Sequence, residues 1–454
     1  MSEVLYFILT IGILVFIHEF GHFAAAKLSD MRVDAFAIGF GYRLLGWNKL
    51  KGFTFGELPK DFDGEGNTDY RLCLLPLGGY VKIAGMVDES ADTSFADKPP
   101  QPYEFRSKSA TKKVFVITAG VMMNLLLAIL VFWGSEYMHG KKSFKATTIG
   151  FVQNAAAAEA GFKSHDKIVS INGKPIVDLE ELRSEIFVST LGKDLSVVVE
   201  RAGAQVTLSL PRKSIPQADS SNSFFYFEGF KTVIDTVLPN SVAAAVGLHR
   251  QDTLLSVNGT PIFSRIQTVD ILTAHKGQQV ELKVLRNQHD TVTIAAQMDA
   301  TGKLGVGLAD IYVGSFESKR YSLIESFSEG IKDLSNMTEL TFVMFKRVIY
   351  REVEFKSVFG GPIKIAQYAA KSANSGMSSF IMFLGYLSLS LAIINILPIP
   401  ALDGGHLVMI LVERLIKREI PIKLKIAIQN TGMVLLLALM AFILYNDFKS
   451  TMGF

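Results

Sequence analysis

The chain has one cysteine, Cys73, among its 454 residues. A single thiol excludes a disulfide framework within the chain and any metal site built from several thiolates. A bound metal ion would therefore be held by histidine and carboxylate side chains. The chain also lacks a strong charge of either sign, since its net charge is +3 at pH 7. The composition gives no indication of nucleic-acid binding, and we expect neither a nucleic acid nor a nucleotide as a partner.

Charged residues are scarce in four long apolar runs. A helix needs roughly 17–25 apolar residues to cross a bilayer. We predict membrane spans within residues 1–28, 114–133, 377–403 and 431–446. The first run lacks the positively charged start of a secretory signal peptide and contains ionisable residues, so we expect it to be retained.

Lysine and arginine are also scarce at both ends of the chain. They are frequent in residues 29–113, and after the third run at Arg414, Lys417, Arg418, Lys423 and Lys425. The positive-inside rule places both of these loops in the cytoplasm and both termini outside. Residues 134–376 then lie outside as well, in a periplasm-like space.

The outer segment contains an internal repeat, because residues 154–176 align with residues 240–262 without a gap. The matched pairs are Asn154 and Asn240, Gly161 and Gly247, Asp166 and Asp252, Asn172-Gly173 and Asn258-Gly259, and Pro175 and Pro261. Each copy predicts a short helix, a glycine stop, a strand, an Asn-Gly turn and a second strand. The pattern resembles the bacterial form of the PDZ domain.

Two such PDZ-like α+β domains would fill residues 142–225 and 226–310. The resemblance implies peptide binding by strand addition, and the alternative is a steric spacer without a ligand. Residues 320–376 predict an amphipathic helical segment, which either lies on the membrane surface or packs against the second repeat.

The sharpest motif is His18-Glu19-Phe20-Gly21-His22 in the first span. Histidines four residues apart lie on one helical face, so that two imidazoles can bind one zinc ion, and Glu19 can act as general base. Three ionisable groups within five residues of an apolar span are costly and indicate function. The alternative, a polar contact between helices, would need one histidine rather than this set.

Two histidines leave a zinc ion short of a ligand, and the third span offers an aspartate. The segment from Asn395 to His406 contains Pro398, Pro400 and Asp403. The prolines break the helix, which is tolerable in a membrane only against protein or a cavity. The first and third spans run in the same direction, so both motifs lie in the cytoplasmic part of the membrane. We expect Asp403 to be the third ligand and the fourth position to be open for water.

The motif HEFGH in a first span and N-x-x-P-x-P-x-L-D-G in a later one resemble the site-2 protease family of intramembrane zinc metalloproteases. The resemblance implies that His18, His22 and Asp403 bind Zn²⁺ and that Glu19 is the base. It implies that Asn395 is a polar partner for the substrate or an intermediate. His406 lies outside the motif, and we expect it to be structural or to support a ligand.

The resemblance also implies a role in regulated intramembrane proteolysis. Substrates would be single-span membrane proteins that have already been cut on the outer side, such as an anti-sigma factor or signal-peptide remnants. The protein would then act in a stress response in the bacterial inner membrane, in contact with membrane lipid.

The first cytoplasmic loop contains two stretches that are too apolar for a solvated connector, at residues 39–41 and 72–83. We predict a β-hairpin in residues 72–83 that dips into the membrane beside the site, with its turn at Pro76 and Gly78-Gly79. The alternative is a small soluble hairpin packed on itself. The predicted substrate contacts are Leu72, Leu74, Val81, Gly39 and Gly41.

The sequence therefore predicts a polytopic α-helical membrane protein with four transmembrane helices. Two tandem PDZ-like domains would lie outside, and a membrane-associated β-hairpin would lie in the first cytoplasmic loop. Two other functions remain open. One is a non-catalytic membrane scaffold that recruits partners through its PDZ domains, and the other is a membrane-anchored zinc protease that cuts soluble proteins.

Overall fold

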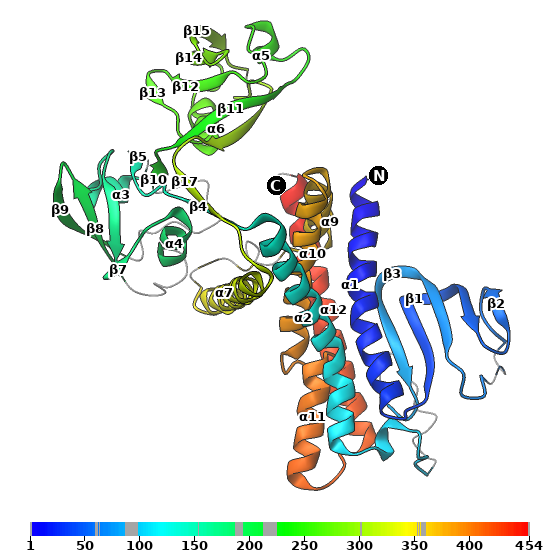
Figure 1. Cartoon of the computed structure of the whole chain (residues 1–454). Coiled ribbons are helices and arrows are strands. Elements are labelled where there is room, and N and C mark those ends of the chain that lie inside the picture. The colour runs from blue at the N-terminus through cyan, green and yellow to red at the C-terminus, as the bar shows by residue number, and fades with distance from the viewer. Residues whose placement is uncertain are drawn as a thin grey trace. The chain divides into compact units, whose positions relative to one another are not determined.

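The structure is a computed structural model that describes residues 2–59, 62, 64–86, 99–152, 154–186, 194–211, 225–299, 302–351, 353, 355 and 360–452. It divides into two compact units (Figure 1). The first comprises Met1–Gly140, Arg320–Val348 and Glu354–Phe454, and the second comprises Lys141–Lys319 and Ile349–Val353.

The described residues of the first unit contain four helices that are long and apolar enough to cross a membrane: α1 (Ser2–Leu28), α2 (Ala110–His139), α10 (Met377–Ile396) and α12 (Ile422–Met452). The prediction of four apolar helices of membrane-spanning length is thereby confirmed. The fourth helix is much longer than the predicted residues 431–446. Both ends of the chain lie at the same end of this bundle (Figure 1), as an even number of spans requires.

Small residues let the spans approach closely. A Cβ on Gly21 of α1 would lie 2.4 Å from the carbonyl oxygen of Ala119 in α2. A Cβ on Gly385 of α10 would lie 2.6 Å from the Val131 side chain. Helix contacts in membranes depend on such close packing, since lipid supplies no hydrophobic drive for association. Helix α2 thus packs against both α1 and α10.

The described residues of this unit also form the helices α7 (Leu323–Ile349), α9 (Pro362–Asn374) and α11 (Asp403–Ile416). The apolar face of α7 packs on α2 and α10, where Leu334, Met337 and Phe345 contact a core of Ala128, Leu389 and Ile393. The sequence had indicated the membrane surface or the second repeat as the neighbour of this helix. The basic segment after the third span, predicted as a loop, is mostly helical: Arg414 lies in α11, and Lys423 and Lys425 lie in α12.

The first cytoplasmic loop forms a sheet of β1 (Val33–Asn48), β2 (Gly52–Phe55) and β3 (Asp69–Ile83), in the order β2-β1-β3. Both ends of β3 pair with β1, because Phe36 is the Cα partner of Val81 as well as of Tyr70. The predicted hairpin within residues 72–83 is therefore wrong, because both ends of this segment pair with β1 and not with each other. The start of β1 lies between the two ends of this segment.

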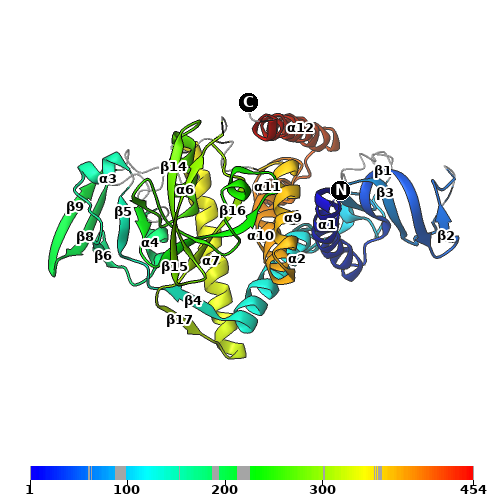
Figure 2. The same ribbon diagram turned by 90° about the horizontal axis from the view of Figure 1, so that it is seen from above.

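Glycines in β1 explain this arrangement. Gly39 and Gly41 have φ values of 89° and 81°, which other residues rarely adopt. A Cβ on Gly39 would also lie 2.8 Å from the carbonyl oxygen of Leu75. The strand can thus bend and stay in contact with β3. The sheet lies beside α1 (Figures 1 and 2) and shares a core with α1 and α2 that includes Ala25, Phe36, Val81, Ile83, Val116 and Ala119.

The second unit contains both copies of the repeat. The first copy runs through α3 (Ala155–Glu159), β6 (Lys167–Ile171), β7 (Lys174–Pro175), α4 (Leu179–Ser184), β8 (Leu195–Arg201) and β9 (Ala204–Leu210). The second runs through α5 (Val242–Ala245), β12 (Thr253–Val257), β13 (Thr260–Pro261), α6 (Arg265–Ala274), β14 (Gln279–Arg286) and β15 (Asp290–Gln297). The order of elements is the same in both, and their assignment to PDZ domains stays a prediction.

The second unit contains six more strands among the described residues. They are β4 (Lys141–Phe144), β5 (Ile149–Val152), β10 (Phe225–Phe227), β11 (Phe230–Val237), β16 (Val306–Tyr312) and β17 (Phe316–Lys319). Strand β10 pairs with β5, β11 pairs with β12 and β16, and β4 pairs with β17. The two ends of the segment that carries the repeat are therefore neighbours.

Each copy is held by an equivalent ion pair between a buried aspartate and a partly exposed arginine. Arg201 donates to Asp166 and to the carbonyl oxygen of Gly161, and Arg286 donates to Asp252 and to the carbonyl oxygen of Gly247. The aspartates belong to the sequence repeat. The arginines lie beyond it, at the ends of β8 and β14, so the structural repeat is longer than the sequence motif.

Candidate metal centre

Three side chains converge on one point in the first unit: His18 and His22 of α1 and Asp403 of α11. The Nε2 atoms of the two histidines are 3.2 Å apart, and they lie 3.3 and 3.4 Å from Oδ2 of Asp403. Ligands of a tetrahedral zinc ion with bonds of about 2.0–2.1 Å are separated by about 3.3 Å. The triangle therefore has the size of one face of a zinc coordination sphere.

The local sequence positions each ligand. His18 and His22 are one helical turn apart on α1, as predicted. Asp403 is the first residue of α11, directly after the break that the prolines introduce between α10 and α11. Gly404 allows the chain to turn there, because a Cβ on it would lie 2.1 Å from the carbonyl oxygen of Leu397.

The residues present fit a zinc ion. Oδ2 of Asp403 is buried and makes no hydrogen bond among the residues that the structure describes, although both histidine nitrogens are near. Such an orphaned carboxylate oxygen is costly, and a cation between the three atoms would satisfy it. Two imidazoles and one carboxylate are a common set for catalytic zinc, with a fourth position left to water or substrate.

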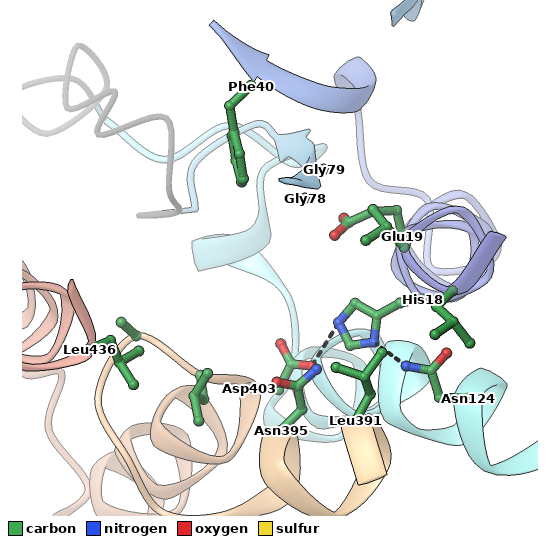
Figure 3. Close-up of a pocket in the computed structure, with 14 residues that line it drawn as sticks. His18, Glu19, Phe40, Gly78, Gly79, Asn124, Leu391, Asn395, Asp403 and Leu436 are labelled. Atoms are coloured by element: carbon green, nitrogen blue, oxygen red, sulfur yellow. Dashed lines mark hydrogen bonds and ion pairs between the residues drawn. The ribbon is translucent and has the colours of Figure 1, made fainter. Parts of the chain in front are cut away.

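A cavity of about 370 Å³ adjoins the triad. Its lining includes His18, Glu19, Asn124, Asn395 and Asp403, together with Gly78 and Gly79 of β3 and Leu436 of α12. Figure 3 shows Glu19 extending from α1 toward Gly78 and Gly79, with Asn395 and Asp403 across the cavity from it. With His22 from the triad, the structure brings together the five residues for which the sequence predicted a catalytic or metal-binding role: His18, Glu19, His22, Asn395 and Asp403.

The predicted substrate contacts are more scattered. Leu72 and Leu74 are exposed on β3, whereas the side chain of Val81 is buried in the core between the sheet and the helices. Gly39 and Gly41 form the bend of β1. The cavity lining includes Phe40, Gly78 and Gly79 rather than these five residues, whose contact with substrate stays a prediction. His406 lies next to Gln429 of α12 and outside the triad.

Helix α2 also contributes to the site, which had not been predicted from the sequence. Nδ1 of His22 lies 2.8 Å from the carbonyl oxygen of Val116, and Nδ1 of His18 lies 3.2 Å from the side-chain amide of Asn124 (Figure 3). Asn124 is fully buried. A lone asparagine within an apolar span was the available signal, since polar side chains there are expensive.

The sequence pattern of Peptidase family M50 matches residues 6–439. This chain belongs to the M50 family, the site-2 proteases. Among its relatives, the regulator of sigma-E protease RseP of Escherichia coli is 27% identical over 98% of this chain and 97% of its own length. The regulator of sigma E protease of Haemophilus influenzae is 29% identical over 97% of both chains. A protein of Neisseria meningitidis, provisionally named a zinc metalloprotease, is 30% identical over the full length of both.

Family membership agrees with the chemistry of the triad. The M50 proteins are metalloproteases, and the names of the relatives imply zinc as the metal. The resemblance drawn from HEFGH and the LDG motif is thereby confirmed. The four apolar helices make the chain a membrane protein.

Proposed function

We propose that this site-2 protease hydrolyses peptide bonds within the transmembrane segments of single-span membrane proteins. The observation that carries the proposal is the triad of His18, His22 and Asp403 inside a bundle of helices that can cross a membrane. A protease for soluble substrates would place these residues in an aqueous domain, whereas His18 and His22 lie on a membrane-length helix.

The residues of the triad and of the adjoining cavity would have different roles in the reaction. His18, His22 and Asp403 would hold Zn²⁺, which supplies a Lewis acid that polarises the scissile carbonyl and acidifies water. Glu19 would take a proton from the attacking water and deliver it to the leaving amine. Asn395, at the end of α10, would donate a hydrogen bond to the substrate backbone and fix its position.

Strand β3 offers a way to bind an unfolded substrate. Opening a transmembrane helix leaves backbone groups without partners, and each costs several kcal/mol in a membrane. Strand β3 is the last strand of its sheet among the described residues, and Gly78 and Gly79 line the cavity. A substrate added to β3 as an extended strand would regain its hydrogen bonds beside Glu19.

We further propose that substrates are cut first on the outer side and that this protein makes the second cut. The names of the relatives in Escherichia coli and Haemophilus influenzae point to control of a sigma factor, which suggests an anti-sigma factor as one substrate. Signal-peptide remnants are another. The distribution of lysine and arginine supports a multi-pass protein of the bacterial inner membrane. Its termini and PDZ-like domains would face the periplasm, and its site would lie toward the cytoplasm.

The proposal is tested with the purified protein in detergent and a synthetic transmembrane peptide. We expect cleavage within the apolar segment, loss of cleavage on chelation and its return on addition of zinc. Cleavage that resists removal of all zinc would overturn the proposal. A zinc-free protein that binds membrane partners without cutting them would instead support the scaffold alternative.

A further inference from the structure

Helix α2 contacts both zinc-binding histidines from one face. Val116, Gly120 and Asn124 follow at intervals of four residues and so lie in one row. Val116 offers its carbonyl oxygen to Nδ1 of His22, 2.8 Å away. Asn124 places its side-chain amide 3.2 Å from Nδ1 of His18. Gly120 lies between them, with no side chain to displace the rings.

The protonation of the histidine rings determines whether Val116 and Asn124 must accept or donate a hydrogen bond. A neutral histidine that binds a metal through Nε2 carries its proton on Nδ1, so Nδ1 must donate a hydrogen bond. The carbonyl oxygen of Val116 accepts such a bond from His22. For His18, the acceptor has to be the oxygen of the Asn124 amide.

The amide of Asn124 can present that oxygen. In the assigned orientation, its Nδ2 faces Nδ1 of His18, and its Oδ1 is buried without a hydrogen bond among the described residues. The two ends of an amide have nearly the same shape, and their assignment follows from the hydrogen-bond network. Rotation of the amide by half a turn places Oδ1 against Nδ1 of His18. The amide nitrogen then faces the opposite way, and Asn124 also lines the cavity, where water or substrate can accept its hydrogens.

We propose that Asn124 is a positioning residue for zinc: its Oδ1 accepts a hydrogen bond from Nδ1 of His18 and so fixes the tautomer and ring orientation that leave Nε2 free for the metal. This inference rests on the proposed zinc protease function. It explains why a polar side chain with no exposed surface occupies an apolar span. The partner of His22 is a main-chain oxygen, so Asn124 is the member of the pair that substitution can test.

The test compares zinc affinity among variants of the full-length protein, measured by competition with a chelator. Asn124→Leu keeps the volume but removes the acceptor, and we expect zinc to bind roughly 10–100-fold more weakly, as for other residues that support metal ligands. Asn124→Asp keeps an acceptor, and we expect its affinity to stay within about threefold of the parent or to exceed it. Asn124→Ala makes the same comparison without added bulk if the leucine variant does not fold.

Ser388→Ala is the matched control. The Ser388 hydroxyl donates to the main-chain carbonyl of Asn124 at 2.7 Å, so its removal disturbs the same place without changing the side chain that faces His18. We expect unchanged zinc affinity. A second readout is the absorption spectrum of the cobalt-substituted protein, which we expect to change in the leucine and alanine variants and to be retained in the aspartate variant.

Two results would overturn this inference but leave the proposed function standing. One is a leucine or alanine variant that binds zinc as tightly as the parent with the same cobalt spectrum. The other is an aspartate variant that loses as much affinity as the leucine variant, which would show that the amide only fills space. A parent protein that binds no zinc would overturn the proposed function, and this inference with it.

Discussion

Gly120 of α2 lies so close to His22 of α1 that a Cβ on the glycine would be 2.3 Å from Nε2 of the histidine. No real Cβ contact is that short, so Gly120→Ala must displace the ring from the triad. We expect zinc affinity to fall by at least about tenfold. Chelator competition on the purified variant measures this.

The matched control is Gly134→Ala on the same helix, where a Cβ would meet nothing within 4 Å. Alanine is the better helix former by about 1 kcal/mol, so this variant should keep its zinc and lose no stability. Equal zinc affinity in the two variants would contradict the placement of α2 against the site.

If the substrate binds by strand addition to β3, the effect of backbone changes on the cleavage rate should alternate from one substrate residue to the next. Backbone N–H groups of an extended chain point alternately toward and away from the neighbouring strand. N-methylation of a synthetic substrate should therefore slow cleavage at every second position near the cut, by roughly fivefold for a lost hydrogen bond of about 1 kcal/mol. The intervening positions serve as controls. A scan without alternation would exclude a strand-like bound substrate.

The second unit is expected to act as a size filter for substrates. Its ends are adjacent, since the main-chain N–H of Lys145 donates to the carbonyl oxygen of Ser315 at 3.2 Å. Residues 146–314 can thus be replaced by a short glycine-serine linker. We expect this variant to cleave substrates that keep their outer domains, which the parent should reject. Substrates already shortened should be cleaved by both, and an unchanged preference would reduce the unit to a spacer.

The ion pair of Arg286 and Asp252 should stabilise the second repeat copy. Burial disfavours ionisation of Asp252, but the bonds from Arg286 and from the N–H of His249 outweigh it and hold the pKa of that carboxyl below its usual range. A lowered pKa stabilises the fold above the unfolded value of about 3.9, and the gain is lost as pH falls through the folded pKa. We expect Arg286→Gln to cost about 2 kcal/mol at neutral pH, as for a lost hydrogen bond to a charged group, and less toward pH 3.

Amide hydrogen exchange of residues 230–299 in the full-length protein measures this loss. Arg250→Gln is the control, because Arg250 and Asp235 form an exposed pair 3.5 Å apart, worth at most about 1 kcal/mol. Equal effects of the two substitutions, or a loss that does not shrink toward acidic pH, would contradict the role given to Asp252.

Local patterns in the sequence were enough to predict that His18, His22 and Asp403 come together. The spacing of His18 and His22 is set by one helix, and the prolines before Asp403 predict the break between α10 and α11 that precedes it. Which residues of α2 face these side chains depends on how α2 is rotated against α1, which no local pattern encodes. Val116 and Gly120 therefore could not be predicted, whereas an isolated asparagine in an apolar span was a signal for Asn124. The sheet was mispredicted for the same reason, since the pairing of Phe36 with both Tyr70 and Val81 joins segments that are distant in the chain.

We propose above all that Glu19 acts as the base beside a zinc ion that it does not bind. The most direct test measures zinc content and peptide cleavage on the same preparations of the parent and of Glu19→Gln. We predict about one zinc ion per chain in both proteins and a fall in the cleavage rate of at least about 10²-fold in the variant. A Glu19→Gln protein that retains zinc and cuts the transmembrane peptide at a rate close to that of the parent would contradict the account.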